Sequence, residues 1–138
     1  MALLGSGQFV ASSAPAQQAG SLEVADQQEL QAITAAMEQD HVYRDMGLSL
    51  RQLAQILSIP EHRLRQRINR ELGYRNFTDF LNHYRTAEAA GRLCHPGDAR
   101  TPVLTIAMDA GYRSMTTFNK AFKARYDMTP VEYRQKSP

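Results

Sequence analysis

The chain contains one cysteine, no tryptophan and no hydrophobic run long enough to cross a membrane as a helix. The lone cysteine, Cys94, cannot form an internal disulfide, which fits a reducing compartment. A spanning helix needs about 20 apolar residues, and the first residues lack the charged start and apolar stretch of a secretory signal. These absences predict a cytoplasmic domain that is stabilised by its hydrophobic core.

The sequence also lacks the residue groups that mark enzymes and metal centres. The four histidines are scattered, and none has a cysteine or carboxylate at the spacing of metal ligands. No carboxylate pair, no nucleophile with a neighbouring base and no phosphate-binding loop is visible. A DNA-processing enzyme would need a reactive thiol, and Cys94 lies in a loop of proline and glycine with no recognisable setting for one. We therefore predict a protein that is not an enzyme and uses no cofactor and no metal.

Strand patterns are absent, whereas helical periodicity begins at residue 26. Residues 1–21 are rich in alanine, serine, glycine and glutamine without a repeating face, which predicts a disordered linker or tail. Asp26 and Glu29 have the spacing of a capping box, which predicts the start of the first helix. The expected fold class is all-α with about seven helices. The expected helical ranges are 26–40, 50–57, 61–72, 77–93, 103–110, 115–126 and a short helix from Pro130.

Residues 110–123 have the pattern of a helix end, a glycine turn and a second helix. Gly111 supplies the left-handed backbone that a tight helix end needs, and Ser114 is placed to cap the following helix. Phe118 and Phe122, four residues apart, share one face of that helix and are expected in the core. This is the arrangement of a helix-turn-helix motif.

A second stretch, residues 50–72, repeats this plan. A short amphipathic helix is followed by a turn and by a helix whose apolar face carries Leu64 and Ile68. When the two stretches are superimposed, these residues match Phe118 and Phe122, with one extra residue in the second turn. Two copies of one pattern in a single chain are a stronger signal than either copy alone.

Positive charge is absent from the first 43 residues and concentrated in the rest. All 16 lysine and arginine residues and nine of the 14 acidic residues lie in residues 44–138, which gives this part a formal charge of +7. Thirteen of the basic residues are arginine, whose planar guanidinium binds phosphates and guanine edges. A basic, arginine-rich domain is suited to an anionic polymer such as nucleic acid.

Several separated blocks of sequence resemble, in order and spacing, the signature of AraC/XylS-type transcription regulators. The resemblance covers residues 26–136 without a large insertion. Residues 69–82 also resemble a branch of this family whose members are often joined to a membrane-embedded sensor. The matching blocks are Leu48-Ser49-Leu50, Leu53-Ala54, Glu71-Leu72-Gly73, Tyr84-Arg85, Ala110-Gly111-Tyr112, Ser114 to Lys123 and Met128 to Arg134.

The resemblance implies two helix-turn-helix subdomains, residues 26–75 and 95–138, joined by a linker helix over residues 76–94 and preceded by a tail of residues 1–25. Each subdomain would place its second helix in one of two successive major grooves of DNA, about 34 Å apart.

The resemblance also assigns contacts to individual residues. The family's base-contacting positions fall on His62, Arg65, Gln66, Thr116, Thr117, Asn119 and Lys120. Residues suited to the DNA backbone are Arg63, Arg67, Arg75, Arg113, Ser114 and Lys123. Pro60 departs from the family, which usually has serine or threonine there, and it offers no hydroxyl to a phosphate. The first subdomain is therefore expected to hold the DNA backbone less firmly.

The partners that the resemblance implies are a promoter operator in double-stranded DNA and RNA polymerase, with activation as the family's usual outcome. The residues before the first helix are too few and too polar to form a sensor domain that binds a small-molecule ligand. The chain is therefore expected to be either a stand-alone small regulator or the C-terminal piece of a longer protein with a sensor domain in front. The linker rich in alanine, serine and glutamine and the acidic first helix favour the second interpretation. The membrane-linked branch implies the cytoplasmic part of an anchored regulator. The alternative interpretation is a protein-interaction module that keeps the fold without specific DNA binding.

Overall fold

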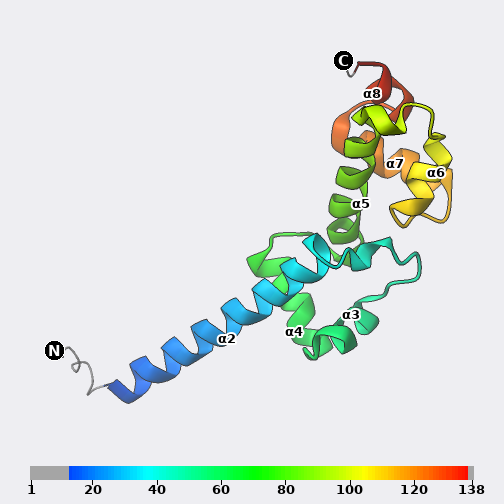
Figure 1. The fold of residues 1–138 in the computed structure, drawn as a ribbon. Coiled ribbons are helices and arrows are strands. Elements are labelled where there is room, and N and C mark those ends of the chain that lie inside the picture. Colours follow the sequence, from blue (N-terminus) through cyan, green and yellow to red (C-terminus); the bar gives the residue numbers. More distant parts are fainter. Residues whose placement is uncertain (1–12, 137–138) are drawn as a thin grey trace.

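The computed structural model describes residues 13–136, and within this range the regular secondary structure is entirely helical, without strands (Figure 1). The prediction of an all-α fold is confirmed. Three short turns supplement the α-helices: the 3-10 turns η2 (Val42–Arg44) and η4 (Pro96–Asp98) and the π-helical turn η3 (Arg67–Glu71). The α-helices are α2 (Ser13–Glu38), α3 (Leu50–Leu57), α4 (Glu61–Gln66), α5 (Phe77–Cys94), α6 (Val103–Asp109), α7 (Met115–Tyr126) and α8 (Pro130–Lys136).

The first helix is longer than the sequence predicts. α2 begins at Ser13, so the predicted start at Asp26 and the predicted tail over residues 13–25 are wrong. Residues 1–12 of that tail, like residues 137–138, lie outside the described range. The C-terminal part of α2 packs against the rest of the domain, so its first helical turns are already formed. Each further residue at the N-terminus then adds one backbone hydrogen bond without the cost of nucleating a new helix. Alanine and glutamine, abundant here, are favourable for that extension.

Side-chain caps begin α3, α7 and α8 at the predicted places. The Ser49 hydroxyl accepts from the Gln52 backbone N–H at 3.1 Å, while the Gln52 side chain accepts from the Ser49 N–H at 3.0 Å. Thr129 and Glu132 form the same reciprocal pair at the start of α8, and Ser114 accepts from the Thr117 N–H at 3.2 Å. Each cap satisfies backbone donors that the first turn of a helix leaves unpaired.

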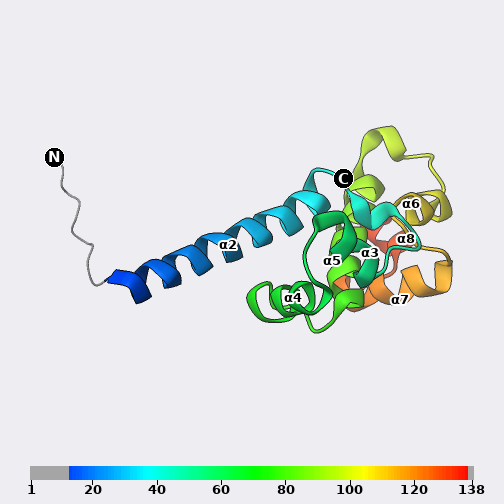
Figure 2. The same ribbon diagram turned by 90° about the horizontal axis from the view of Figure 1, so that it is seen from below.

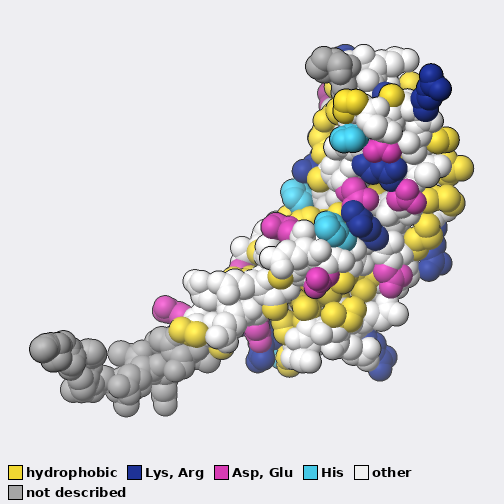
Figure 3. All heavy atoms as spheres, viewed as in Figure 1, with side chains coloured by type: hydrophobic (Ala, Val, Ile, Leu, Met, Phe, Trp, Pro, Cys, Tyr) yellow, Lys and Arg dark blue, Asp and Glu magenta, His cyan; other side chains and the backbone are white. Residues whose placement is uncertain are grey.

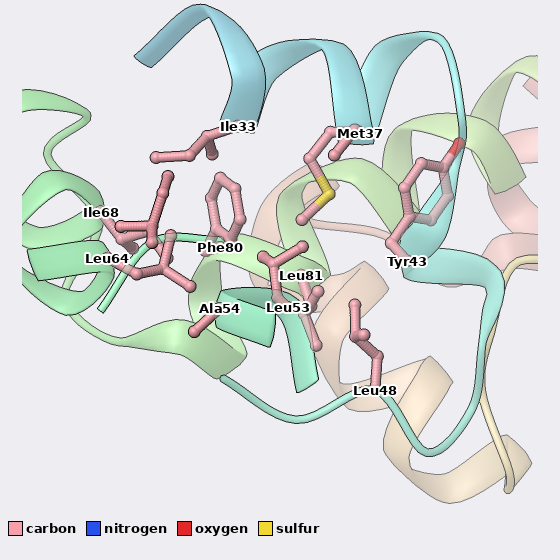
Figure 4. Packing of buried hydrophobic residues seen from close by; sticks show 12 residues of the cluster. Ile33, Met37, Tyr43, Leu48, Leu53, Ala54, Leu64, Ile68, Phe80 and Leu81 are labelled. Atoms are coloured by element: carbon pink, nitrogen blue, oxygen red, sulfur yellow. The ribbon is translucent and has the colours of Figure 1, made fainter. Parts of the chain in front are cut away.

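The buried side chains form two clusters that meet on α5. Figure 4 shows the first, in which Ile33 and Met37 of α2 lie over Leu64, Ile68 and Phe80. The second cluster is built from α5, α6 and α7 around Phe118 and Phe122, as the helical spacing predicts. Burying such side chains is worth about 1.5–3 kcal/mol each. The members of the second cluster are Ala89, Ala90, Leu93, Ile106, Ala107, Tyr112, Phe118 and Phe122.

Polar contacts from α5 hold the chain around the two clusters together. Arg85 donates from Nε to the Tyr43 carbonyl at 2.7 Å and from Nη2 to the Asp45 carbonyl at 2.9 Å. The Tyr112 hydroxyl donates to Asn82 Oδ1 at 2.6 Å, and Arg125 of α7 donates to the His83 carbonyl. α5 is therefore tied to segments from both clusters by hydrogen bonds as well as by packing.

Asp98 provides a test of acid sensitivity. Its carboxylate accepts from Arg92 Nη2 at 2.9 Å and from the Thr101 hydroxyl at 2.9 Å, and the Arg92 hydrogen bond chiefly lowers the pKa of Asp98 from 3.8 to about 2. A lowered folded-state pKa stabilises the fold above the unfolded value and loses that effect as the pH falls toward the folded value. We expect Asp98→Asn to lower Tm at pH 7, with the difference from wild type disappearing between pH 4 and pH 2.

Thermal unfolding of wild type and Asp98→Asn across this pH range checks the prediction. Asp40→Asn, a change of the same kind at an exposed carboxylate beyond α2, serves as the control. A Tm difference for Asp98→Asn that does not change with pH would contradict the expectation.

Candidate nucleic-acid interface

The helix α4 turns its polar side chains to solvent. Leu64 and Ile68 are buried in the core, and His62, Arg65 and Gln66, three of the predicted base-contacting residues, are exposed on the remaining surface. Arg65 makes only a long ion pair of 3.6 Å with Glu61, and such exposed pairs contribute little. These three side chains are therefore available to a partner.

The helix α7 repeats this arrangement. Phe118 and Phe122 are fully buried, and Thr116, Asn119 and Lys120 are exposed, as is Lys123 one turn further on. Because residues three and four apart share a helical face, these four side chains form one stripe. Thr117 is also exposed but lies beside the stripe.

The two helices present equivalent positions. The stripe that begins on α4 consists of residues 62, 65, 66 and 69, and the stripe of α7 consists of residues 116, 119, 120 and 123, with the same intervals between them. The prediction omitted Asn69 and Arg70, which are exposed where α4 passes into the π turn η3. The spacing by three and four residues was the signal that would have included Asn69.

Arg67 does not have the position that a DNA-backbone contact needs. Only 7% of its surface is exposed, and its guanidinium pairs with Asp26, with Glu29 at 3.1 Å and with Glu71 at 2.8 Å. The hydrogen bond to Glu71, followed in effect by the one to Glu29, raises the pKa of Arg67 above its usual value. The residue is thus a charged bridge between α2 and the π turn η3 that follows α4, so we remove it from the predicted contacts.

Other predicted backbone contacts lie around the starts of α5 and α7. Arg75 is largely exposed and pairs with Asp79 at 3.0 Å. It lines a recess of about 120 Å³ together with Arg65 and Asn69, next to the start of α5. Arg113 is exposed just before Ser114, so basic side chains and unpaired helix N–H groups occur together at both places.

The residues before α4 and α7 differ as the sequence predicts. Pro60 precedes α4 and makes no side-chain cap, whereas the Ser114 hydroxyl both accepts from the Thr117 backbone and donates to the Thr117 side chain at 3.0 Å. Thr117 is therefore partly engaged in the cap of its own helix. Arg63 is also engaged, since its Nη2 lies 2.8 Å from Glu29 Oε2.

Figure 2 shows α4 and α7 along the same edge of the molecule, with α5 between the two subdomains that carry them. The face seen in Figure 3 carries basic, acidic and hydrophobic side chains intermixed, without a continuous basic patch. The two helices that carry the stripes therefore lie along one edge of the molecule.

Within residues 13–136, no group of three histidine, cysteine or acidic side chains is placed to hold a metal ion. In the same range, none of the helices combines the length and the apolar character that crossing a membrane requires. Cys94 is exposed at the last position of α5.

The comparisons with known proteins agree with this geometry. Residues 53–136, more than half of the chain, match a family model described as a helix-turn-helix domain. The chain belongs to the AraC-type helix-turn-helix family. This is a family of DNA-binding domains of transcription regulators and not a family of enzymes.

Three similar proteins place the AraC-type domain among regulators. The regulatory protein SoxS of Escherichia coli is 34% identical over 71 residues, covering 51% of this chain and 64% of SoxS. The HTH-type transcriptional regulator MtrA of Neisseria gonorrhoeae is 39% identical over 56 residues, covering 41% of this chain and 18% of MtrA. The C-terminal domain of AraT, a response regulator from Geobacillus stearothermophilus, superimposes with a TM-score of 0.64 at 27% identity, over 75% of this chain and 83% of that domain.

Proposed function

We propose that this AraC-type domain binds a promoter operator by placing α4 and α7 in two successive major grooves. The observation that supports this most directly is the pair of equivalent stripes on the two helices. His62, Arg65 and Gln66 on α4 are exposed, and Thr116, Asn119 and Lys120 on α7 are exposed at corresponding positions. Arginine, asparagine and glutamine are the side chains that bind guanine and adenine edges in pairs of hydrogen bonds.

The surroundings of the stripes are suited to phosphates. Arg75 lies beside the start of α5, Arg113 lies just before the start of α7, and Lys123 lies in the last turn of α7. Exposed arginine and lysine side chains next to helix N-termini favour bound anions through charge and through free N–H groups. In this proposal Arg75, Arg113 and Lys123 set the register on the duplex, and the other residues of the two stripes read its sequence.

The regulatory setting of the domain follows from its relatives. SoxS is named a regulatory protein, MtrA a transcriptional regulator and AraT a response regulator whose C-terminal domain is matched. By analogy, we propose that the bound domain contacts RNA polymerase to activate transcription and that a sensor domain precedes it in a longer protein. The range matched in MtrA, 18% of its length, is compatible with such an arrangement.

Selection of bound duplexes from a random DNA pool at two salt concentrations tests the proposal. We expect enrichment of two short blocks of sequence separated by about one helical turn, roughly 34 Å. A single block would mean that one helix reads little sequence, with α4 the first candidate because Pro60 gives it no hydroxyl cap. Binding without enrichment that vanishes at moderate salt would leave only charge attraction and would favour the protein-interaction alternative.

A further inference from the structure

The helix α2 lies across the first helix-turn-helix and continues beyond it. Its last turns are anchored by Ile33 and Met37, which are fully buried over the same cluster that contains Leu64 and Ile68 of α4 (Figure 4). The N-terminal part of α2 projects away from the body (Figure 1). Asp26 and Glu29 lie between these two parts, beside α4.

Glu29 binds Arg63 of α4 and Arg67 of the π turn η3 at the same time. Its Oε2 accepts from Arg63, with Nε at 2.9 Å and Nη2 at 2.8 Å. Its Oε1 accepts from Arg67 Nε at 3.1 Å. Asp26 binds Arg67 at Nη2, so the carboxylates of α2 neutralise two of the basic side chains that the sequence assigned to the DNA backbone.

The two arginines differ in how firmly they are held. Arg67 has 9% of its side chain exposed and carboxylates at three of its nitrogens, so its withdrawal would leave buried charge unpaired. Arg63 has 45% of its side chain exposed and is held by Glu29 alone. Arg63 would therefore become available to a phosphate if the charge of Glu29, whose side chain is only 16% exposed, were removed.

We propose that Asp26 and Glu29 are positioning residues that limit how many arginines of α4 reach DNA, a proposal that rests on the function proposed above. Asp26 and Glu29 hold Arg67 as part of the α2–α4 packing. Glu29 competes with a DNA phosphate for Arg63 and keeps it off the duplex in the wild-type chain. The cation that α4 offers to DNA is then Arg65, which lines the recess beside the start of α5.

The salt dependence of DNA binding measures this arrangement, because each phosphate that a cation neutralises adds about 0.9 to the slope of log K against log salt. The probe is the duplex enriched in the selection, with a scrambled duplex of equal length beside it. We expect Glu29→Gln to steepen the slope by about 0.9 on both duplexes. We expect Arg63→Ala to leave the slope unchanged in the wild type and to abolish the increase in the Glu29→Gln background.

Glu23→Gln is the matched control, since it makes the same charge change at an exposed position nearer the N-terminus of α2. An equal increase in slope for Glu23→Gln and Glu29→Gln would overturn the proposal, because overall charge would then explain the effect. A slope for Glu29→Gln equal to that of the wild type would also overturn it.

Thermal unfolding of each variant separates binding from stability. If Glu29→Gln does not fold, the test rests on Arg63→Ala alone. A salt-dependence slope below that of the wild type would show that Arg63 already binds phosphate and would overturn the proposal. An unchanged slope would support it. A wild-type chain that binds neither duplex would overturn the proposed function itself. A wild type that binds with the same slope as Glu29→Gln would overturn only the role of Glu29.

Discussion

Replacing Gly111 with alanine is expected to destabilise the domain by about 2–5 kcal/mol. The backbone at Gly111 has a φ of 115°, which residues with a side chain rarely adopt. A Cβ at this position would lie 2.4 Å from the Tyr43 carbonyl oxygen and 2.6 Å from Arg85 Nε. The new methyl group would therefore push the turn before α7 away from η2 and α5, which it contacts here.

Substitutions at two other glycines separate the backbone contribution to this loss of stability from the steric contribution. Gly73 has a φ of 80°, but a Cβ added there would have open space within 4 Å, so Gly73→Ala should cost about 1–2 kcal/mol from the backbone alone. Gly91, inside α5, also has open space where a Cβ would lie, and Gly91→Ala should stabilise by about 0.5–1 kcal/mol. Urea unfolding of the three variants gives these differences. Equal losses for Gly111→Ala and Gly73→Ala would show that the contact with Tyr43 and Arg85 relaxes freely.

Arg65→Ala is expected to weaken binding to the selected operator by about 1–3 kcal/mol, which is roughly 5- to 150-fold. The guanidinium is exposed on the α4 stripe, and its partner Glu61 is 3.6 Å away and also exposed, so little must be broken to reach a base edge. The loss should be confined to duplexes that carry the preferred base at one operator position. Titrations of the selected duplex and of single-base variants measure it.

Lys123→Ala should behave differently from Arg65→Ala. A lysine that contacts phosphate contributes equally to all sequences, so its removal should weaken binding to selected and random duplexes alike and reduce the salt slope by about one. Lys136→Ala, the same change on the exposed end of α8, is the control and should leave both quantities unchanged. If Arg65→Ala and Lys123→Ala lower binding to selected and random DNA equally, the assignment of base contacts to α4 is wrong.

Local sequence signals predicted most of the helices correctly. α7 runs from Met115 to Tyr126 and α3 from Leu50 to Leu57, as expected. Their boundaries are set by neighbours in the chain: Ser49 and Ser114 cap the starts, and apolar residues repeat at three and four positions. Caps and periodicity act within a few residues, so they are readable without a structure.

Interactions between distant segments decided what the sequence left open. Arg63, Arg65 and Arg67 are close in sequence, but Arg67 is the buried one of the three. Asp26 and Glu29 of α2 and Glu71 of its own turn surround its guanidinium. The helix predicted to run to Leu72 passes into a π turn at Arg67, where the Leu72 N–H donates to the Arg67 carbonyl at 2.9 Å.

The sequence by itself determined most of the helices and their caps, the two buried faces and the family of this chain, because these depend on local spacing and residue type. The tertiary structure decided the length and docking of α2, the removal of Arg67 from the surface and the engagement of Arg63 by Glu29. It also decided the close approach of Gly111 to Tyr43, which are 68 positions apart. Such contacts join side chains from segments that no local pattern relates, so they exist only once the helices have packed.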